Sequence, residues 1–135
     1  MKILFYGFCH AHVDAMYRRA TQMPDQLEIA GCIEEDKRLG EAAADRLGFS
    51  LDSECYENWL EKDIDIVAIG GKYGQRGEAV IKALQHGKHV ISDKPLCTRL
   101  EELEEIEKIV KEKKLKIGCI DVYKRQGYRE YNASA

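Results

Sequence analysis

The sequence lacks any long hydrophobic run and any marked excess of charge of one sign. No apolar stretch approaches the length of about 20 residues that a transmembrane helix needs, and the opening Met1–Gly7 lacks the apolar segment of a signal peptide. The 135 residues contain 21 Lys and Arg against 24 Asp and Glu, a net charge of −3, without the basic excess of a nucleic-acid-binding domain. We therefore expect a cytoplasmic protein that binds neither nucleic acid nor a membrane.

Cysteine is present, but in no pattern that indicates a disulfide framework or a zinc site. The five cysteines form no Cys-x-x-Cys pair, so we expect reduced thiols that act as small buried or half-buried apolar side chains. Cys9, His10 and His12, with His86 and His89, include donors that zinc prefers. Their spacing matches no common closed zinc site and the two groups fall in different parts of the predicted fold, so we expect no metal.

Short β-rich segments alternate with helical patterns along the chain, which is typical of βαβ units around a parallel sheet. The predicted strands cover residues 2–6, 27–33, 64–69, 89–92 and 115–120, with a brief further strand within 49–55. The predicted helices are one after the first strand, three over 37–47, 56–61 and 76–86, and one opened by the capping-box sequence Thr98–Glu101. The sequence thus predicts an α/β fold with a doubly wound, mostly parallel six-stranded sheet in three layers, a Rossmann fold.

The pattern indicates one domain over residues 1–120. A hydrophobic fraction of 44% is enough for a sizeable core in a domain of this length. Residues 121–135 show no periodicity and end in Asn-Ala-Ser-Ala. We expect this segment to be a non-native or disordered tail.

The loop after the first strand has the position of a dinucleotide-binding loop but only part of its glycine pattern. Gly7 supplies the tight turn, whereas Cys9 and His12 stand where the G-x-G-x-x-G fingerprint has its other glycines. We expect Gly7, Phe8, Cys9, His10 and His12 to face the phosphates of a dinucleotide.

An acid follows the second predicted strand. Glu34 lies 27 residues after Gly7, as expected for a carboxylate that accepts hydrogen bonds from the adenosine ribose. Its charge would repel a 2′-phosphate and favour NAD, whereas Lys37 and Arg38 could pair with that phosphate. The cofactor is therefore expected to be NAD or NADP, with a modest preference for NAD.

The stretch from Asp65 to Leu96 resembles the Gfo/Idh/MocA family. In that family a strand, a loop and a helix are followed by Gly-Lys-His-Val and Glu-Lys-Pro. The corresponding part of this stretch is Gly87-Lys88-His89-Val90-Ile91-Ser92-Asp93-Lys94-Pro95-Leu96. The resemblance implies that Lys94 is the catalytic lysine and that Pro95 sets the turn that aims it. It also implies that the loop residues Gly70, Gly71 and Lys72, together with Asp93, Lys94 and Pro95, contact the cofactor.

This chain departs from the family pattern at several of these positions. Gly71-Lys72 replaces a common Thr-Pro, and Asp93 replaces glutamate. Gly74 and Arg76 stand where histidines are common.

The resemblance implies an NAD(P)-dependent oxidoreductase that acts on CH–OH groups of a sugar, cyclitol or related polyol. In the family the substrate-binding aspartate and histidine lie in a second α/β domain, which also supplies most of the dimer interface. We therefore expect a homo-oligomeric full-length protein and an inactive fragment here. One alternative is a stand-alone dinucleotide-binding or redox-sensing module. Another is a domain that binds S-adenosylmethionine, but the sequence Asp93-Lys94-Pro95 argues against it because that chemistry has no evident use for the lysine.

Overall fold

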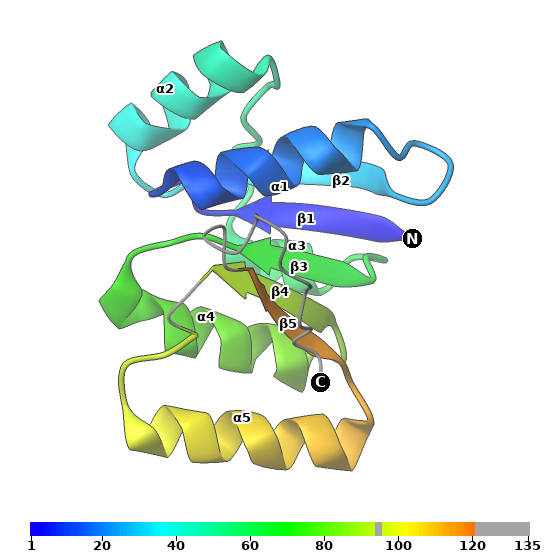
Figure 1. Ribbon diagram of the computed structural model, residues 1–135, viewed down its shortest axis with the longest axis vertical. Coiled ribbons are helices and arrows are strands. Elements are labelled where there is room, and N and C mark those ends of the chain that lie inside the picture. Colours follow the sequence, from blue (N-terminus) through cyan, green and yellow to red (C-terminus); the bar gives the residue numbers. More distant parts are fainter. Residues whose placement is uncertain (94–95, 121–135) are drawn as a thin grey trace, which may run out of the picture.

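A five-stranded, all-parallel sheet forms the centre of the protein, with helices on both faces (Figure 1). The computed structural model describes residues 1–93 and 96–120. The strand order is β2-β1-β3-β4-β5. In chain order the elements are β1 (Lys2–Tyr6), α1 (Ala11–Thr21), β2 (Glu28–Ile33), α2 (Lys37–Leu47), α3 (Tyr56–Leu60), β3 (Ile66–Ile69), α4 (Tyr73–Gln85), β4 (His89–Asp93), α5 (Leu100–Lys113) and β5 (Ile117–Ile120). The predicted three-layer Rossmann fold is therefore confirmed.

The sheet separates two apolar cores, because side chains alternate between its faces along each strand. On β1, Ile3 and Phe5 pack with α1 and α2, whereas Leu4 packs with α3, α4 and α5. On β3, Val67 and Ala68 divide in the same way and are fully buried. Burial on both faces explains why this strand reads as a continuous apolar run in the sequence.

Helix α2 begins and ends where the sequence predicts. The side chain of Asp36 accepts hydrogen bonds from the backbone N–H groups of Arg38 (3.0 Å) and Leu39 (3.2 Å), which are donors that the first helical turn leaves without partners. Gly48 ends the helix with φ of 83°, a left-handed conformation that glycine adopts without strain.

An ion pair joins α1 to α2 on one side of the sheet. The guanidinium of Arg46 donates from Nε to Asp14 Oδ2 (2.6 Å) and from Nη2 to Asp14 Oδ1 (3.0 Å). Asp14 is buried, with 7% of its surface exposed. Because a buried carboxylate needs such partners, this pair holds α2 against α1.

The prediction of a brief strand within residues 49–55 is wrong, because the structure describes all of these residues and has no strand between α2 and α3. Asp52 donates one backbone hydrogen bond to Cys32 of the edge strand β2 (2.9 Å), but its side chain accepts from the backbone N–H of Glu54 (2.9 Å). This Asx turn bends the chain away from the edge and stops a ladder from forming.

Two helix starts also differ from expectation. Helix α5 begins at Leu100 with Arg99 as its N-cap and without a side-chain capping bond, so the predicted capping box of Thr98 and Glu101 does not form. Helix α4 begins at Tyr73, three residues before the predicted start at Arg76. Glycines at 74 and 77 weaken the helical signal there, but tertiary contacts of α4 with β3, β4 and α5 outweigh the low propensity of glycine.

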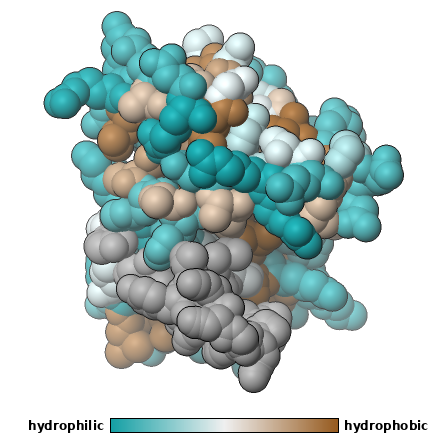
Figure 2. All heavy atoms as spheres, turned by 45° about the horizontal axis from the view of Figure 1, so that its top comes forward, coloured by the Kyte–Doolittle hydropathy of each residue, from teal (hydrophilic) through white to brown (hydrophobic). Residues whose placement is uncertain are grey.

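Hydrophilic residues predominate on the side that carries α1 and α2, and apolar residues are interspersed among them (Figure 2). Within the described ranges, no helix has the length and apolar character required to cross a bilayer.

Candidate functional site

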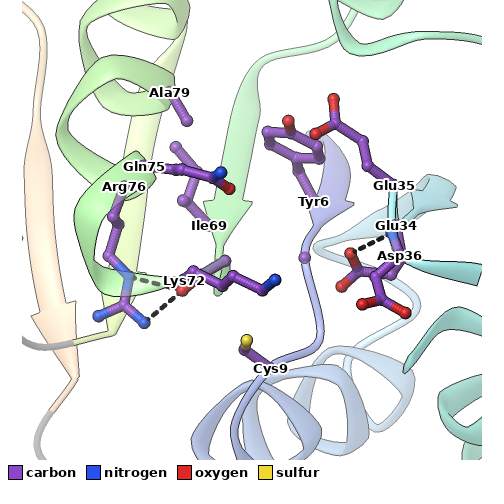
Figure 3. A pocket seen from close by; sticks show the side chains of 12 residues that line it. Tyr6, Cys9, Glu34, Glu35, Asp36, Ile69, Lys72, Gln75, Arg76 and Ala79 are labelled. Carbon is purple, nitrogen blue, oxygen red and sulfur yellow. Dashed lines mark hydrogen bonds between the residues drawn. The ribbon is translucent and has the colours of Figure 1, made fainter. Parts of the chain in front are cut away.

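A cleft of about 280 Å³ lies at the carboxyl edge of the sheet (Figure 3). Strand β1 has β2 on one side and β3 on the other, and the helices that follow β1 and β3 lie on opposite faces, as the two cores show. Doubly wound sheets bind ligands at such a switch point. The cleft is lined by Tyr6, Gly7, Cys9, Glu34, Glu35, Asp36, Ile69, Gly71, Lys72, Gln75, Arg76 and Ala79.

The loops after β1 and β3 touch each other at glycines. Gly7 has φ of 94°, and a Cβ atom there would lie 2.6 Å from the backbone nitrogen of Gly71. The N–H of Cys9 donates to the carbonyl oxygen of Gly70 (3.0 Å), and a Cβ atom on Gly70 would overlap the side chain of Val13 in α1. Close packing between helix and sheet, which the third glycine of the fingerprint usually allows, therefore depends here on Gly70 in the neighbouring loop.

The carboxylate of Glu34 is held by two backbone donors. Its Oε1 accepts from Phe8 (2.7 Å) and its Oε2 from Asp36 (2.9 Å). An ionised carboxylate has about four acceptor sites, so both oxygens can accept further hydrogen bonds from a ligand. The side chain of Phe8 is itself buried in the core under α1, 1% exposed, and reaches the site only through its backbone.

Lys72 and Cys9 face the cleft from the two loops. Lys72 is the exposed N-cap residue of α4 and extends across the cleft towards the side that carries Glu34 and Asp36 (Figure 3). Burial, and then the negative charge of Glu34, raises the pKa of the Cys9 thiol, although Lys72 and Arg76 oppose this. Cys9 is therefore a neutral thiol at neutral pH.

Arg76 links the ends of two strands beneath the cleft. Its Nε and Nη2 donate to the carbonyl oxygen of Gly71 (3.2 and 2.7 Å), and its Nη1 donates to the carbonyl oxygen of Asp93 (3.2 Å). The residue is fully buried, which arginine tolerates only when its donors are used. Sequence patterning shows Arg76 only as a departure from the family and does not predict this role.

His12 and Asp93 form a pair at the end of β4. The distance between His12 Nδ1 and Asp93 Oδ1 is 2.6 Å. Asp93 is completely buried, whereas 36% of the His12 side chain is exposed. His12 stands where the fingerprint has its third glycine and Asp93 where the family has glutamate, so two departures from the pattern contact each other.

Five of the predicted cofactor residues line the cleft, namely Gly7, Cys9, Glu34, Gly71 and Lys72. Gly70 packs behind them, His10 is the N-cap of α1, and His12 and Asp93 lie outside the lining. Lys94 and Pro95, and the tail 121–135, lie outside the described residues.

Part of the lining, mainly between β1, the end of β2 and α4, is not predicted by the sequence. The ring of Tyr6 stacks on that of Tyr56 in α3 at 3.9 Å between centroids. Burial is the main cause that raises the pKa of Tyr6, and a hydrogen bond to Glu35 adds to it. The missed lining residues are Tyr6, Glu35, Asp36, Ile69, Gln75, Arg76 and Ala79. Alternation along β1 predicts which face Tyr6 occupies, but not that a cleft lies there.

The structure does not bring the candidate zinc ligands together. His86 pairs with Glu61 (3.3 Å), and His89 Nδ1 accepts from the backbone N–H of Lys116 (3.0 Å) at the other edge of the sheet. Among the residues that the structure describes, no three histidine, cysteine or acidic side chains are grouped so as to hold a metal ion.

Solved structures share this fold. An oxidoreductase from Erwinia carotovora atroseptica matches with a TM-score of 0.80 and 22% identity, over 88% of this chain and 35% of its own. The WlbA dehydrogenase from Chromobacterium violaceum, in complex with NADH and UDP-GlcNAcA, matches with a TM-score of 0.77 and 22% identity, over 93% of this chain and 36% of its own.

Sequence comparison assigns the family. A Streptococcus pneumoniae protein described as an uncharacterized oxidoreductase is 32% identical over 94 residues, which are 70% of this chain and 25% of that protein. This chain therefore spans about a quarter of the length of that relative. The family model described as "Oxidoreductase family, NAD-binding Rossmann fold" (GFO_IDH_MocA) matches residues 1–120. The chain thus belongs to the Gfo/Idh/MocA oxidoreductase family, of which it carries the NAD-binding Rossmann domain.

Proposed function

We propose that the chain binds NAD as the dinucleotide domain of an oxidoreductase that acts on the CH–OH group of a sugar, cyclitol or related polyol. The observation that carries this proposal is the position of Glu34. Its carboxylate is fixed at the end of β2 by two backbone donors, beside Gly7 and across the cleft from Lys72. An acid at this point suits the two hydroxyls of an adenosine ribose.

The rest of the cleft supports a dinucleotide by its chemistry. Tyr6, Ile69 and Ala79 offer apolar surface for the adenine. A Cβ atom on Gly71 would have no atom within 4 Å, so the backbone is open there, close to the N-terminus of α1. A diphosphate at this point would lie at the positive end of the helix dipole. Lys72 adds an exposed cation on the opposite wall.

Three consecutive carboxylates support NAD over NADP. Glu34, Glu35 and Asp36 all line the cleft, and a 2′-phosphate bound at Glu34 would face this negative charge. Lys37 is largely exposed and lies 4.0 Å from Glu41 on its own helix, so it does not offset the acids at the cleft. A modest preference for NAD follows from this balance.

Hydride transfer to or from the substrate carbon is the chemistry that a bound nicotinamide would supply. By family resemblance, Lys94 would hold or move the proton of the substrate hydroxyl. The WlbA relative was solved with NADH and UDP-GlcNAcA, which supports a sugar-related substrate. A homo-oligomeric full-length protein in the cytoplasm, and binding without turnover by these 135 residues, belong to the same proposal.

Titration of the chain with NADH and NADPH tests the proposal, with S-adenosylmethionine as the unrelated nucleotide. We expect saturable quenching or enhancement of nicotinamide fluorescence, with NADH bound more tightly than NADPH. An absence of saturable NADH binding at millimolar concentration, or tighter binding of S-adenosylmethionine, would overturn it.

A further inference from the structure

The order of the strands sets the direction in which a dinucleotide would lie. From β2 to β4 the carboxyl ends carry Glu34, then Gly7, then Gly70 and finally Asp93. Three steps between neighbouring strands, each about 4.8 Å, separate Glu34 from Asp93 by about 14 Å across the sheet. A ligand whose adenosine ribose binds Glu34 and whose diphosphate lies at Gly7 would therefore extend towards Asp93 with its second ribose.

His12 is a partly exposed polar side chain at the Asp93 end of this ligand path. Its Nδ1 lies 2.6 Å from the buried carboxylate of Asp93. A buried carboxylate accepts rather than donates, so Nδ1 carries the proton and the bond fixes both the tautomer and the orientation of the ring. Asp93 is in turn held at its own carbonyl oxygen by Arg76 and by the Ser92 hydroxyl (3.2 and 2.9 Å).

This arrangement leaves Nε2 of His12 as a lone-pair acceptor. Nε2 makes no hydrogen bond within the part of the chain that the structure describes. Diphosphate oxygens are acceptors as well and cannot donate to it, whereas ribose hydroxyls can. The negative charge of Asp93 behind the ring also disfavours an anion at this point.

We propose that His12, held by Asp93, binds the nicotinamide-side ribose of the dinucleotide through Nε2. This inference rests on the proposed function and changes the role first expected for His12, from a phosphate-facing residue to one that recognises a sugar hydroxyl. It also gives a reason for the departure at His12: an imidazole in place of glycine finds a carboxylate at the end of β4 that orients it.

The variant His12→Asn tests the role of Nε2 separately from that of Nδ1. The amide nitrogen of asparagine occupies the place of Nδ1 and can still donate to Asp93, but nothing occupies the place of Nε2. Affinities of wild type and variant are measured for ADP, ADP-ribose and NADH. ADP lacks the second ribose, ADP-ribose has it without the nicotinamide, and NADH has both.

We expect the variant to bind ADP like the wild type and to bind ADP-ribose and NADH about tenfold more weakly, the effect of one lost hydrogen bond of about 1.4 kcal/mol. Unchanged affinity for ADP-ribose would overturn the inference. Equal loss for all three ligands would assign His12 to the diphosphate or to folding and would overturn it as well. If the wild type binds none of the three, the proposed function fails, and this inference with it.

Discussion

The backbone N–H of Phe8 donates a 2.7 Å hydrogen bond to Oε1 of Glu34, so the loop after β1 and the acid after β2 are one structural unit. The second carboxylate oxygen binds the N–H of Asp36, which is also the N-cap of α2. Glu34 therefore has a role in the free protein as well as a proposed role with ribose. Changes at this position are expected to alter binding and stability together, and each experiment has to measure both.

Replacing Glu34 with glutamine tests the acid. We expect NADH affinity to fall about tenfold, because a hydrogen bond from the ribose to a charged carboxylate contributes about 1.5 kcal/mol that the neutral amide does not supply. NADPH affinity should fall less, since the repulsion of its 2′-phosphate is relieved. Titration of both nucleotides measures the ratio, and thermal unfolding measures the stability. Glu41→Gln, at an acid 62% exposed on α2, is the control. An unchanged ratio of the two affinities would remove Glu34 from ribose recognition.

The contact between the two loops makes Gly7 sensitive to any side chain. Gly7→Ala combines a left-handed backbone with a Cβ atom 2.6 Å from the nitrogen of Gly71, so we expect a loss of more than about 2 kcal/mol of stability and of NADH binding. The matched control is Gly48→Ala, where φ is 83° but no atom lies within 4 Å of the new Cβ. That variant should lose only about 1 kcal/mol and bind normally. Similar losses in the two variants, measured by denaturant unfolding, would contradict the close approach.

The ion pair between α1 and α2 is expected to contribute measurably to stability. Arg46→Met keeps the apolar part of the side chain but leaves the buried Asp14 without its bidentate partner, at a cost of about 2 kcal/mol. The control is Lys37→Met, which removes an 86% exposed ammonium 4.0 Å from Glu41 and should change stability by less than about 0.5 kcal/mol. Equal melting temperatures for the two variants would show that Asp14 does not depend on Arg46.

The cysteines are expected to react with a thiol reagent in the order of their exposure. Cys55 is exposed, Cys9 is half-buried in the cleft and Cys32 is buried. Burial raises the pKa of Cys32 to about 12 and also raises that of Cys9, so less thiolate is present at pH 8 and each rate should still increase above that pH. Peptide mass spectrometry after alkylation identifies the sites.

The same alkylation measurement, repeated with NADH present, tests where the dinucleotide binds, with Cys55 as the internal control. Saturating NADH should slow alkylation of Cys9 several-fold and leave that of Cys55 unchanged, because Cys9 lines the cleft and Cys55 does not. Equal protection of both cysteines would indicate general stabilisation, and an absence of protection at Cys9 would place the ligand elsewhere.

Elements with strong local signals were predictable from the sequence. Strand β1 and helix α2 have the predicted bounds, since an apolar run that ends in glycine and an Asp–Gly pair of helix caps are local features. The strand expected within 49–55 failed because a single side chain, Asp52, turned the segment through a hydrogen bond that periodicity does not reveal. The capping box at Thr98 failed because the N-cap is Arg99, one residue later.

The amino-acid sequence by itself determined the alternation of strands and helices, the end of β1 at Gly7 and the acid at the end of β2, because these follow from periodicity and from the conformational limits of single residues. Only the tertiary structure decided which distant residues meet: Gly7 with Gly71, Arg76 with Asp93, and His12 with Asp93. These contacts depend on the order β2-β1-β3-β4 in the sheet, which brings the ends of strands far apart in the chain to one edge. The glycine fingerprint read along one loop is therefore incomplete, whereas the close packing it serves is achieved in space by two loops.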